Sequence, residues 1–148
     1  MPTLAVNKSV GFSFEIQEKF EAGIALSGPE VKAAKQGNIS LKGSYITIRP
    51  DGAWLIGCYI SPYKPAQATQ QGYTPTRDRH LLLRQSELSR LVGAASAKGL
   101  TVLPISFYTK GGLIKVEVAI AKGKKKADKR ESIKKRDIER RIRQSVHH

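Results

Sequence analysis

The sequence has too few cysteine and histidine residues to form the common metal or thiol sites. Its 148 residues include one cysteine, Cys58, which excludes a disulfide within the chain and a cysteine-based zinc module. Of the three histidines, His147 and His148 end the chain, so His80 is the only one inside the body. With one histidine in the body there is no histidine pair to bind a metal, and we identify no Cys–His catalytic couple. We therefore predict no metal, no cofactor, no catalytic residue and no enzymatic activity.

Long apolar runs and acidic residues are also scarce. No apolar stretch approaches the ~20 residues of a membrane-spanning helix, and the opening MPTLAVNKSV lacks the basic and apolar regions of a secretory signal. We expect a cytoplasmic protein that binds no membrane. Twelve acidic residues stand against 26 Lys and Arg, which gives a formal net charge of +14. This excess favours a polyanionic partner, RNA or DNA.

The basic residues are concentrated at the end of the chain. From Lys122 to His148 there are twelve Lys and Arg against four Asp and Glu, a net charge of +8. The same segment has little apolar surface to offset the entropy lost when a backbone becomes ordered. We predict a β-barrel domain over residues 1–121 and a basic tail over residues 122–148, disordered when free and helical when bound.

In the body, apolar and polar residues alternate as they do in β-strands. The pattern predicts a long strand at 12–24, a hairpin at 44–60 around Asp51 and Gly52, a second hairpin at 100–121, and helices at 29–36 and 86–99. Five or more mostly antiparallel strands with two or three short helices are typical of a small closed or partly closed barrel. An oligonucleotide-binding-type β-barrel fits the charge best.

Residues 61–76 carry proline, glycine and polar residues without a period, which predicts a long surface loop. Arg77 and Arg79 follow this loop, and Tyr63 and Tyr73 lie within it. Arginine binds phosphate and tyrosine stacks on bases, so these four residues predict an RNA surface. The other large aromatic residues are expected in the core: Trp54, Phe14, Phe20 and Phe107.

Several motifs occur in order over nearly the whole chain. They are Asn7-Lys8, FEAGIAL at 20–26, GPEVK at 28–32, GNIS at 37–40, PTRDRHLLL at 75–83, VAIAKGKK at 118–125 and DKR at 128–130. Together they resemble the SsrA-binding protein family, SmpB, which partners transfer-messenger RNA (tmRNA) in bacterial ribosome rescue. The chain departs from the usual family pattern at Pro29, Lys35, His80 and Ala127; a stacking contact expected in the tail could not come from Ala127.

The resemblance implies an adaptor of trans-translation. The barrel would bind the tRNA-like domain of tmRNA, as a monomer, through residues at the family's contact positions: Asn7, Glu21, Leu82 and Lys115. The complex would enter the A site of a stalled ribosome, with the tail in the decoding centre and the empty mRNA channel, and lead to peptide tagging. The tail residues implied in this role are Lys122, Lys124, Lys125, Asp128, Lys129, Arg130, Lys134, Lys135, Arg136 and Arg140.

Two other interpretations stay open at this point. A ribosomal or RNA-chaperone barrel with a basic tail would show the same charge distribution, and an enzyme acting on RNA is the third candidate. The family resemblance favours the adaptor over both.

Overall fold

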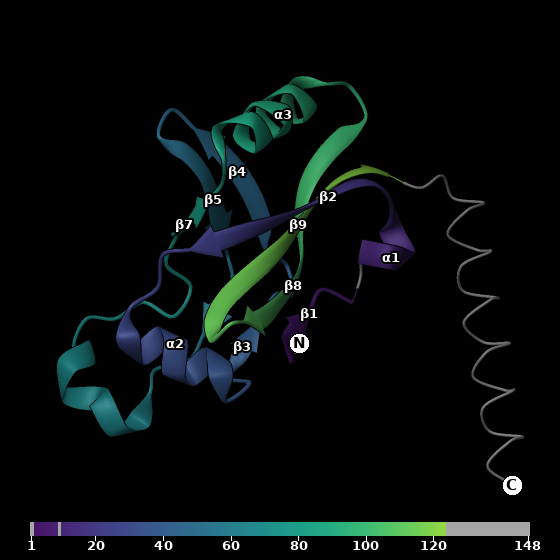
Figure 1. The fold of residues 1–148 in the computed structure, drawn as a ribbon. Coiled ribbons are helices and arrows are strands. Elements are labelled where there is room, and N and C mark those ends of the chain that lie inside the picture. The colour runs from purple at the N-terminus through teal and green to yellow at the C-terminus, as the bar shows by residue number, and fades with distance from the viewer. Residues whose placement is uncertain (1, 9, 124–148) are drawn as a thin grey trace, which may run out of the picture.

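The computed structural model describes residues 2–8 and 10–123, and one antiparallel sheet organises them (Figure 1). Its seven strands lie in the order β1-β8-β9-β2-β7-β5-β4. Their bounds are β1 Thr3–Val6, β2 Phe14–Ile24, β4 Tyr45–Arg49, β5 Gly52–Ile56, β7 Arg79–Leu82, β8 Leu100–Lys110 and β9 Leu113–Gly123. A separate pair consists of β3 Ile39–Ser40 and β6 Tyr59–Ile60. The helices are α1 Val10–Ser13, α2 Gly28–Lys35, α3 Gln85–Ser96 and the 3-10 helix η1 Lys64–Gln70.

The three longest strands, β2, β8 and β9, form the centre of the fold. Gly111 and Gly112 turn β8 into β9, and both have positive φ values that favour glycine. Alternate side chains of β9 point into the core, as the second predicted hairpin requires: Ile114, Val116, Val118 and Ile120. The sheet curls until β4 lies against β8, although no backbone ladder among the described strands joins β4 to β1. The predicted class, mainly antiparallel β with short helices, is confirmed.

The two longer α-helices cover opposite ends of the sheet (Figure 1). Helix α3 packs on β8 and β4 through Leu91 and Ala94, whereas α2 buries Ala33 and Ala34 in the same core. A smaller apolar cluster lies beside α1, where Val10 contacts Leu103 and Ala121. The N-terminal segment therefore covers a patch of the sheet that is separate from the main core.

Some predicted elements differ from the observed ones. The strand predicted at 12–24 is β2, which begins at Phe14 because residues 10–13 form α1 and bury Val10. The helix predicted at 86–99 is α3, which begins at Gln85, so Ser86 is not its cap. The backbone N–H of Arg84, the residue before the helix, donates to the Glu87 carboxylate at 3.2 Å. The predicted loop at 61–76 contains η1.

Of the four aromatic residues expected in the core, only Phe20 and Phe107 lie there. Phe14 packs, partly buried, against the smaller cluster beside α1. Trp54 lies on the outer face of β5, since its neighbours Ala53 and Leu55 fill the core from the other face. Period-two alternation defines two faces of a strand but does not say which one is covered.

Strand β9 runs to Gly123, so Lys122, predicted as the first residue of the tail, belongs to a strand. Residues 124–148 and the tail contacts predicted among them lie outside the described residues. Within the described ranges, no helix is long and apolar enough to cross a membrane.

Candidate RNA interface

Three strands that are distant in the sequence meet at Gly23 on the outer face of the sheet. Gly23 of β2 pairs with Lys115 of β9 on one side and with Leu82 of β7 on the other. A Cβ atom placed on Gly23 would lie 3.2 Å from the Cβ of Leu82, which is tighter than an ordinary contact. Because Gly23 has no side chain, the side chain of Leu82 can lie over β2 at this point.

Glu21 shares this surface, because residues two apart on a strand point to the same face. Glu21, Leu82 and Lys115 line one groove of about 490 Å³, with His80 and Gly52 on its β7 and β5 side. Leu82 is 54% exposed although it is an apolar residue. Three of the four contact positions implied by the family resemblance thus lie in one groove.

The Glu21 carboxylate is held in place by its neighbours. The Tyr108 hydroxyl donates a hydrogen bond of 2.6 Å to Oε2, and the Lys110 ammonium group lies 3.4 Å from both carboxylate oxygens. The hydrogen bond from Tyr108 lowers the pKa of Glu21 below its ordinary value, and Lys110 and Lys115 act in the same direction. Burial and the adjacent carboxylate raise the pKa of Tyr108. Glu21 therefore presents an ionised, oriented hydrogen-bond acceptor to the groove.

Asn7, the fourth implied contact, does not line this groove. It follows the end of β1, where its side-chain amide donates to the carbonyl oxygen of Pro104 at 3.1 Å. It lines two other hollows together with Val6 and Lys8. A ligand that touched both Asn7 and Leu82 would have to extend beyond the groove.

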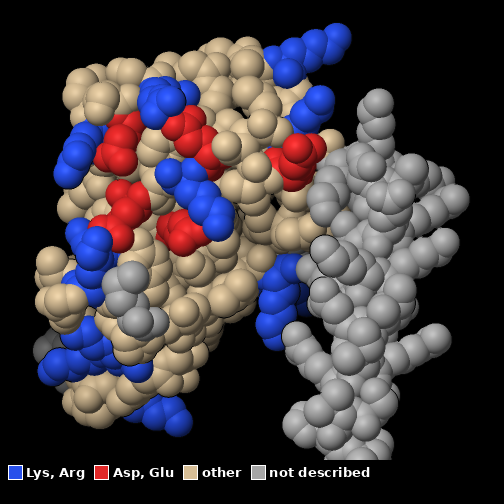
Figure 2. Space-filling view, turned by 45° about the vertical axis from the view of Figure 1, so that its right-hand side comes forward, with Lys and Arg blue, Asp and Glu red and all other residues tan. Residues whose placement is uncertain are grey.

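Charges of both signs are mixed on the described surface. Figure 2 shows a face on which acidic side chains lie among basic ones. Lys19 of β2 pairs with Glu117 of β9 at 3.4 Å, and Arg90 of α3 pairs with Glu18 of β2 at 2.5 Å. The described surface therefore carries mixed charges and is not uniformly basic.

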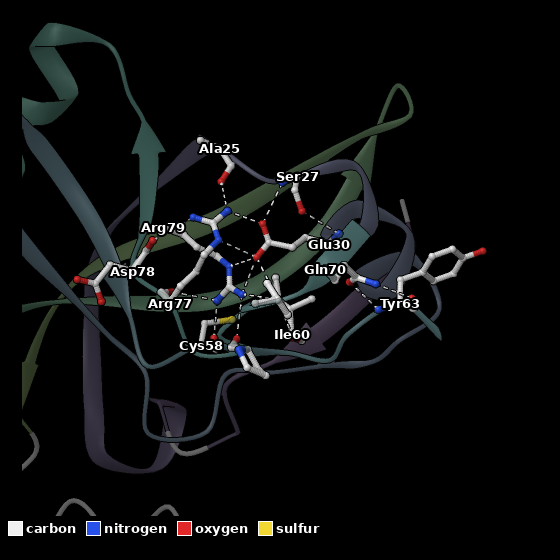
Figure 3. Close-up of polar contacts among 12 residues, drawn as sticks. Ala25, Ser27, Glu30, Cys58, Ile60, Tyr63, Gln70, Arg77, Asp78 and Arg79 are labelled. Carbon is white, nitrogen blue, oxygen red and sulfur yellow. Dashed lines mark hydrogen bonds and ion pairs between the residues drawn. The ribbon is translucent and has the colours of Figure 1, made fainter. Parts of the chain in front are cut away.

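Arg79, predicted on an RNA surface, is completely buried, and the structure contradicts that prediction. Its guanidinium is paired with the carboxylate of Glu30, which is 1% exposed, and the shortest N···O distance is 2.7 Å (Figure 3). It also donates to the carbonyl oxygens of Cys58 and Pro75 and to the hydroxyl of Tyr73. A buried guanidinium requires such partners, and sequence pattern alone does not reveal them.

Arg77 contributes to the same cluster from a partly exposed position. Its guanidinium pairs with both carboxylate oxygens of Glu30 and donates to the carbonyl oxygen of Ala25 at 3.3 Å. Its side chain is 38% exposed, so a role in binding RNA stays a prediction. The Tyr73 hydroxyl donates to the Glu30 carboxylate and so belongs to the same cluster. The Gln70 side chain forms hydrogen bonds with both the backbone N–H and the carbonyl oxygen of Tyr63.

Glu30 has a second role as the third residue of α2. The Ser27 backbone N–H donates to its carboxylate at 2.9 Å, while the Ser27 hydroxyl accepts from the Glu30 backbone N–H at 3.3 Å, a capping box. Burial alone would raise the pKa of Glu30, but hydrogen bonds from Arg77, Ser27 and Arg79 outweigh it and lower the pKa to about 2. One ionised side chain thus joins the start of α2 to β7.

Beside the groove, Trp54 and His80 form a stacked aromatic pair. Their backbones are register partners on β5 and β7, and their ring centroids lie 4.8 Å apart with 28° between the planes. The guanidinium carbon of Arg49 lies 5.2 Å from the Trp54 ring centroid. Local sequence does not indicate this stack, because it depends on the pairing of β5 with β7 in the sheet.

Comparison with known proteins identifies the family. The SmpB protein family model matches residues 4–148. The chain belongs to the SmpB family. It is 47% identical to a protein named SsrA-binding protein from Sulfurihydrogenibium sp. (strain YO3AOP1), over 96% of this chain and 92% of that relative. It is 42% identical to an SsrA-binding protein from Rubrobacter xylanophilus, over 99% of this chain and 96% of the relative.

This chain also resembles a chain in a solved structure. A chain from a structure described as "tmRNA-SmpB: a journey to the center of the bacterial ribosome" superposes with a TM-score of 0.64 and 36% sequence identity. The match covers 86% of this chain and 92% of that chain. The SmpB resemblance predicted from the ordered motifs is therefore confirmed, in sequence and in fold.

Proposed function

We propose that this protein is an RNA-binding adaptor of trans-translation. It binds the tRNA-like domain of tmRNA and delivers it to stalled ribosomes, where the tagging of the unfinished peptide begins. Membership of the SmpB family, the SsrA-binding relatives and the tmRNA-SmpB structure support this role. The observation that carries the proposal is the groove in which Glu21, Leu82 and Lys115 lie together.

Each of these three side chains offers a different contact to RNA. The exposed apolar surface of Leu82 can pack against a base or ribose, and the fixed carboxylate of Glu21 can accept from amino or 2′-hydroxyl groups. The Lys115 ammonium can bind a phosphate. A site that combines one cation with shaped and acceptor contacts discriminates a folded RNA by more than its charge.

The tail, residues 124–148 beyond β9, would serve on the ribosome. Its basic residues suit a channel walled by RNA phosphates, and an occupying mRNA would compete for the same space. The role of Asp128, Lys129 and Arg130 at the decoding centre rests on the family resemblance. Because binding and ribosome entry use different parts of the chain, the two activities should separate.

The first experiment titrates the protein with a labelled transcript of the tRNA-like domain and with an ordinary tRNA of equal length, at two salt concentrations. We expect a preference for the tRNA-like domain that survives added salt. Leu82→Ala, Glu21→Gln and Lys115→Gln should each weaken this binding. Their matched controls are exposed residues outside the groove: Val92→Ala, Glu15→Gln and Lys98→Gln. Equal binding of both RNAs, falling steeply with salt, would favour a general RNA-binding barrel.

The second experiment removes residues 124–148, a cut that leaves β9 intact. The truncated protein should keep its affinity for the tRNA-like domain but lose peptide tagging on stalled ribosomes. A proportionate loss of both activities would contradict the division between barrel and tail. The proposal also assigns binding without catalysis, so cleavage or modification of RNA by the purified protein would contradict it.

A further inference from the structure

The aromatic stack beside the groove is a surface feature with its own supports. Trp54 points away from the core, since Ala53 and Leu55 on either side of it are 1% and 0% exposed on the inner face. The indole N–H donates to the Asp51 carboxylate at 2.8 Å, so the ring is anchored to the hairpin turn. Its packing on His80 and Arg49 holds an aromatic surface at the boundary with solvent.

His80 continues the stack into the groove. Its Nε2 atom lies 3.2 Å from the carbonyl oxygen of Asp51, and it shares the outer face of β7 with Leu82, two residues on. A Cβ atom on Gly52 would lie 2.8 Å from Nε2, so only glycine at that position allows this approach. The imidazole is therefore an aromatic wall of the groove, backed by Trp54.

We propose that the Trp54–His80 stack is a binding site for an unpaired nucleobase of the RNA held in the groove. This inference rests on the proposed RNA-binding function and names one chemical contact within it. An unpaired base presents a flat π face, which aromatic side chains bind by stacking. Leu82 extends the apolar surface from His80, and Lys115 lies across the groove, where it can bind the phosphate of the same strand.

A stacking contact has a recognisable dependence on salt. Phosphate contacts release counterions, so they weaken as the salt concentration rises, whereas ring stacking itself contributes no such dependence on salt. Replacing the imidazole with a methyl group should therefore lower affinity equally at low and high salt. Replacing it with another aromatic ring should preserve affinity.

The protein contains one tryptophan, so its fluorescence reports directly on this stack. We would titrate the full chain with a labelled transcript of the tRNA-like domain, and record the anisotropy of the RNA and the emission of Trp54 together. A fully paired RNA duplex of similar length is the control ligand, because its bases are stacked on one another. The expected result is a change in Trp54 emission that follows the anisotropy for the transcript and is absent with the duplex.

Variants then separate stacking from charge. We expect His80→Ala to weaken binding of the transcript roughly 5- to 100-fold with an unchanged salt slope, and His80→Phe to bind close to wild type. Val92→Ala on α3 is the control for a loss of exposed apolar surface. Thermal melts followed by circular dichroism confirm that each variant is folded, and the wild-type fluorescence titration stands without any variant.

The outcomes distinguish this inference from the function on which it rests. Normal RNA binding with unchanged Trp54 emission and no effect of His80→Ala would overturn the stacking site and leave the adaptor role intact. His80→Phe as weak as His80→Ala, or an equal emission change with the duplex, would also overturn it. Failure of the wild-type protein to bind the tRNA-like domain would instead overturn the proposed function.

Discussion

The buried cluster around Glu30 makes the most quantitative prediction of the structure. Replacing Glu30 with Gln keeps the size of the side chain and an oxygen acceptor, but leaves the fully buried guanidinium of Arg79 without a carboxylate. Removing one partner of a buried ion pair costs about 3–5 kcal/mol, because the remaining charge stays desolvated. We expect Glu30→Gln to lower the free energy of unfolding at pH 7 by that amount.

The pKa of Glu30 supplies an independent magnitude. It falls from an ordinary value of 4.5 to about 2 in the folded protein, and a shift of ~2.5 units corresponds to about 3 kcal/mol. Because the folded-state pKa is depressed, this stabilisation is fully present above pH 4.5 and is lost as the pH falls toward 2. The difference in stability between wild type and Glu30→Gln should therefore be constant above about pH 5 and shrink below it.

The assay is urea unfolding followed by circular dichroism, at several pH values between 7 and 3. The matched control is Glu18→Gln, which removes a carboxylate paired with Arg90 on the surface, where the two side chains are 33% and 63% exposed. A surface pair contributes roughly 0–1 kcal/mol. A loss of stability in Glu30→Gln no larger than that in Glu18→Gln, or a loss as large at pH 3 as at pH 7, would contradict this prediction.

Three further predictions follow from single contacts. Tyr108→Phe removes the hydrogen bond to Glu21, so the pKa of Glu21 should rise toward its ordinary value in an NMR titration. Binding of the tRNA-like domain should weaken as well. An unchanged affinity would contradict the role of Tyr108 in positioning Glu21. Gly23→Ala should displace Leu82 and weaken RNA binding, while the melting temperature changes little. The control Gly28→Ala, whose new Cβ has no atom within 4 Å, should bind RNA normally. Equal affinities of the two variants would argue against a tight contact between Gly23 and Leu82. Burial raises the pKa of Cys58 to about 12, so its thiol should react with iodoacetamide far more slowly in the native protein than in urea, and rapid native labelling would show that the cluster opens.

Local patterns predicted much of the fold. The alternation in β9 and the turn at Gly111 and Gly112 were sufficient for the second hairpin, and the Pro29–Glu30 start was sufficient for α2. These elements depend on neighbours in the chain, whose spacing and turn chemistry can be read directly. Boundaries that depend on tertiary packing were less accurate: residues 12 and 13 of the strand predicted at 12–24 belong to α1 instead.

The site divides in the same way. The alternation of apolar and polar residues predicted the mainly β class, the ordered motifs indicated the family, and the family resemblance implied the candidates Glu21, Leu82 and Lys115. Only the tertiary structure decided that these three share a groove, because they are brought together by the pairing of β7, β2 and β9 at Gly23. It also decided that Arg79 is a buried partner of Glu30, and that Trp54 faces outward. A sequence specifies which side chains alternate along a strand, but burial depends on what packs against each face, and that is a property of the assembled sheet.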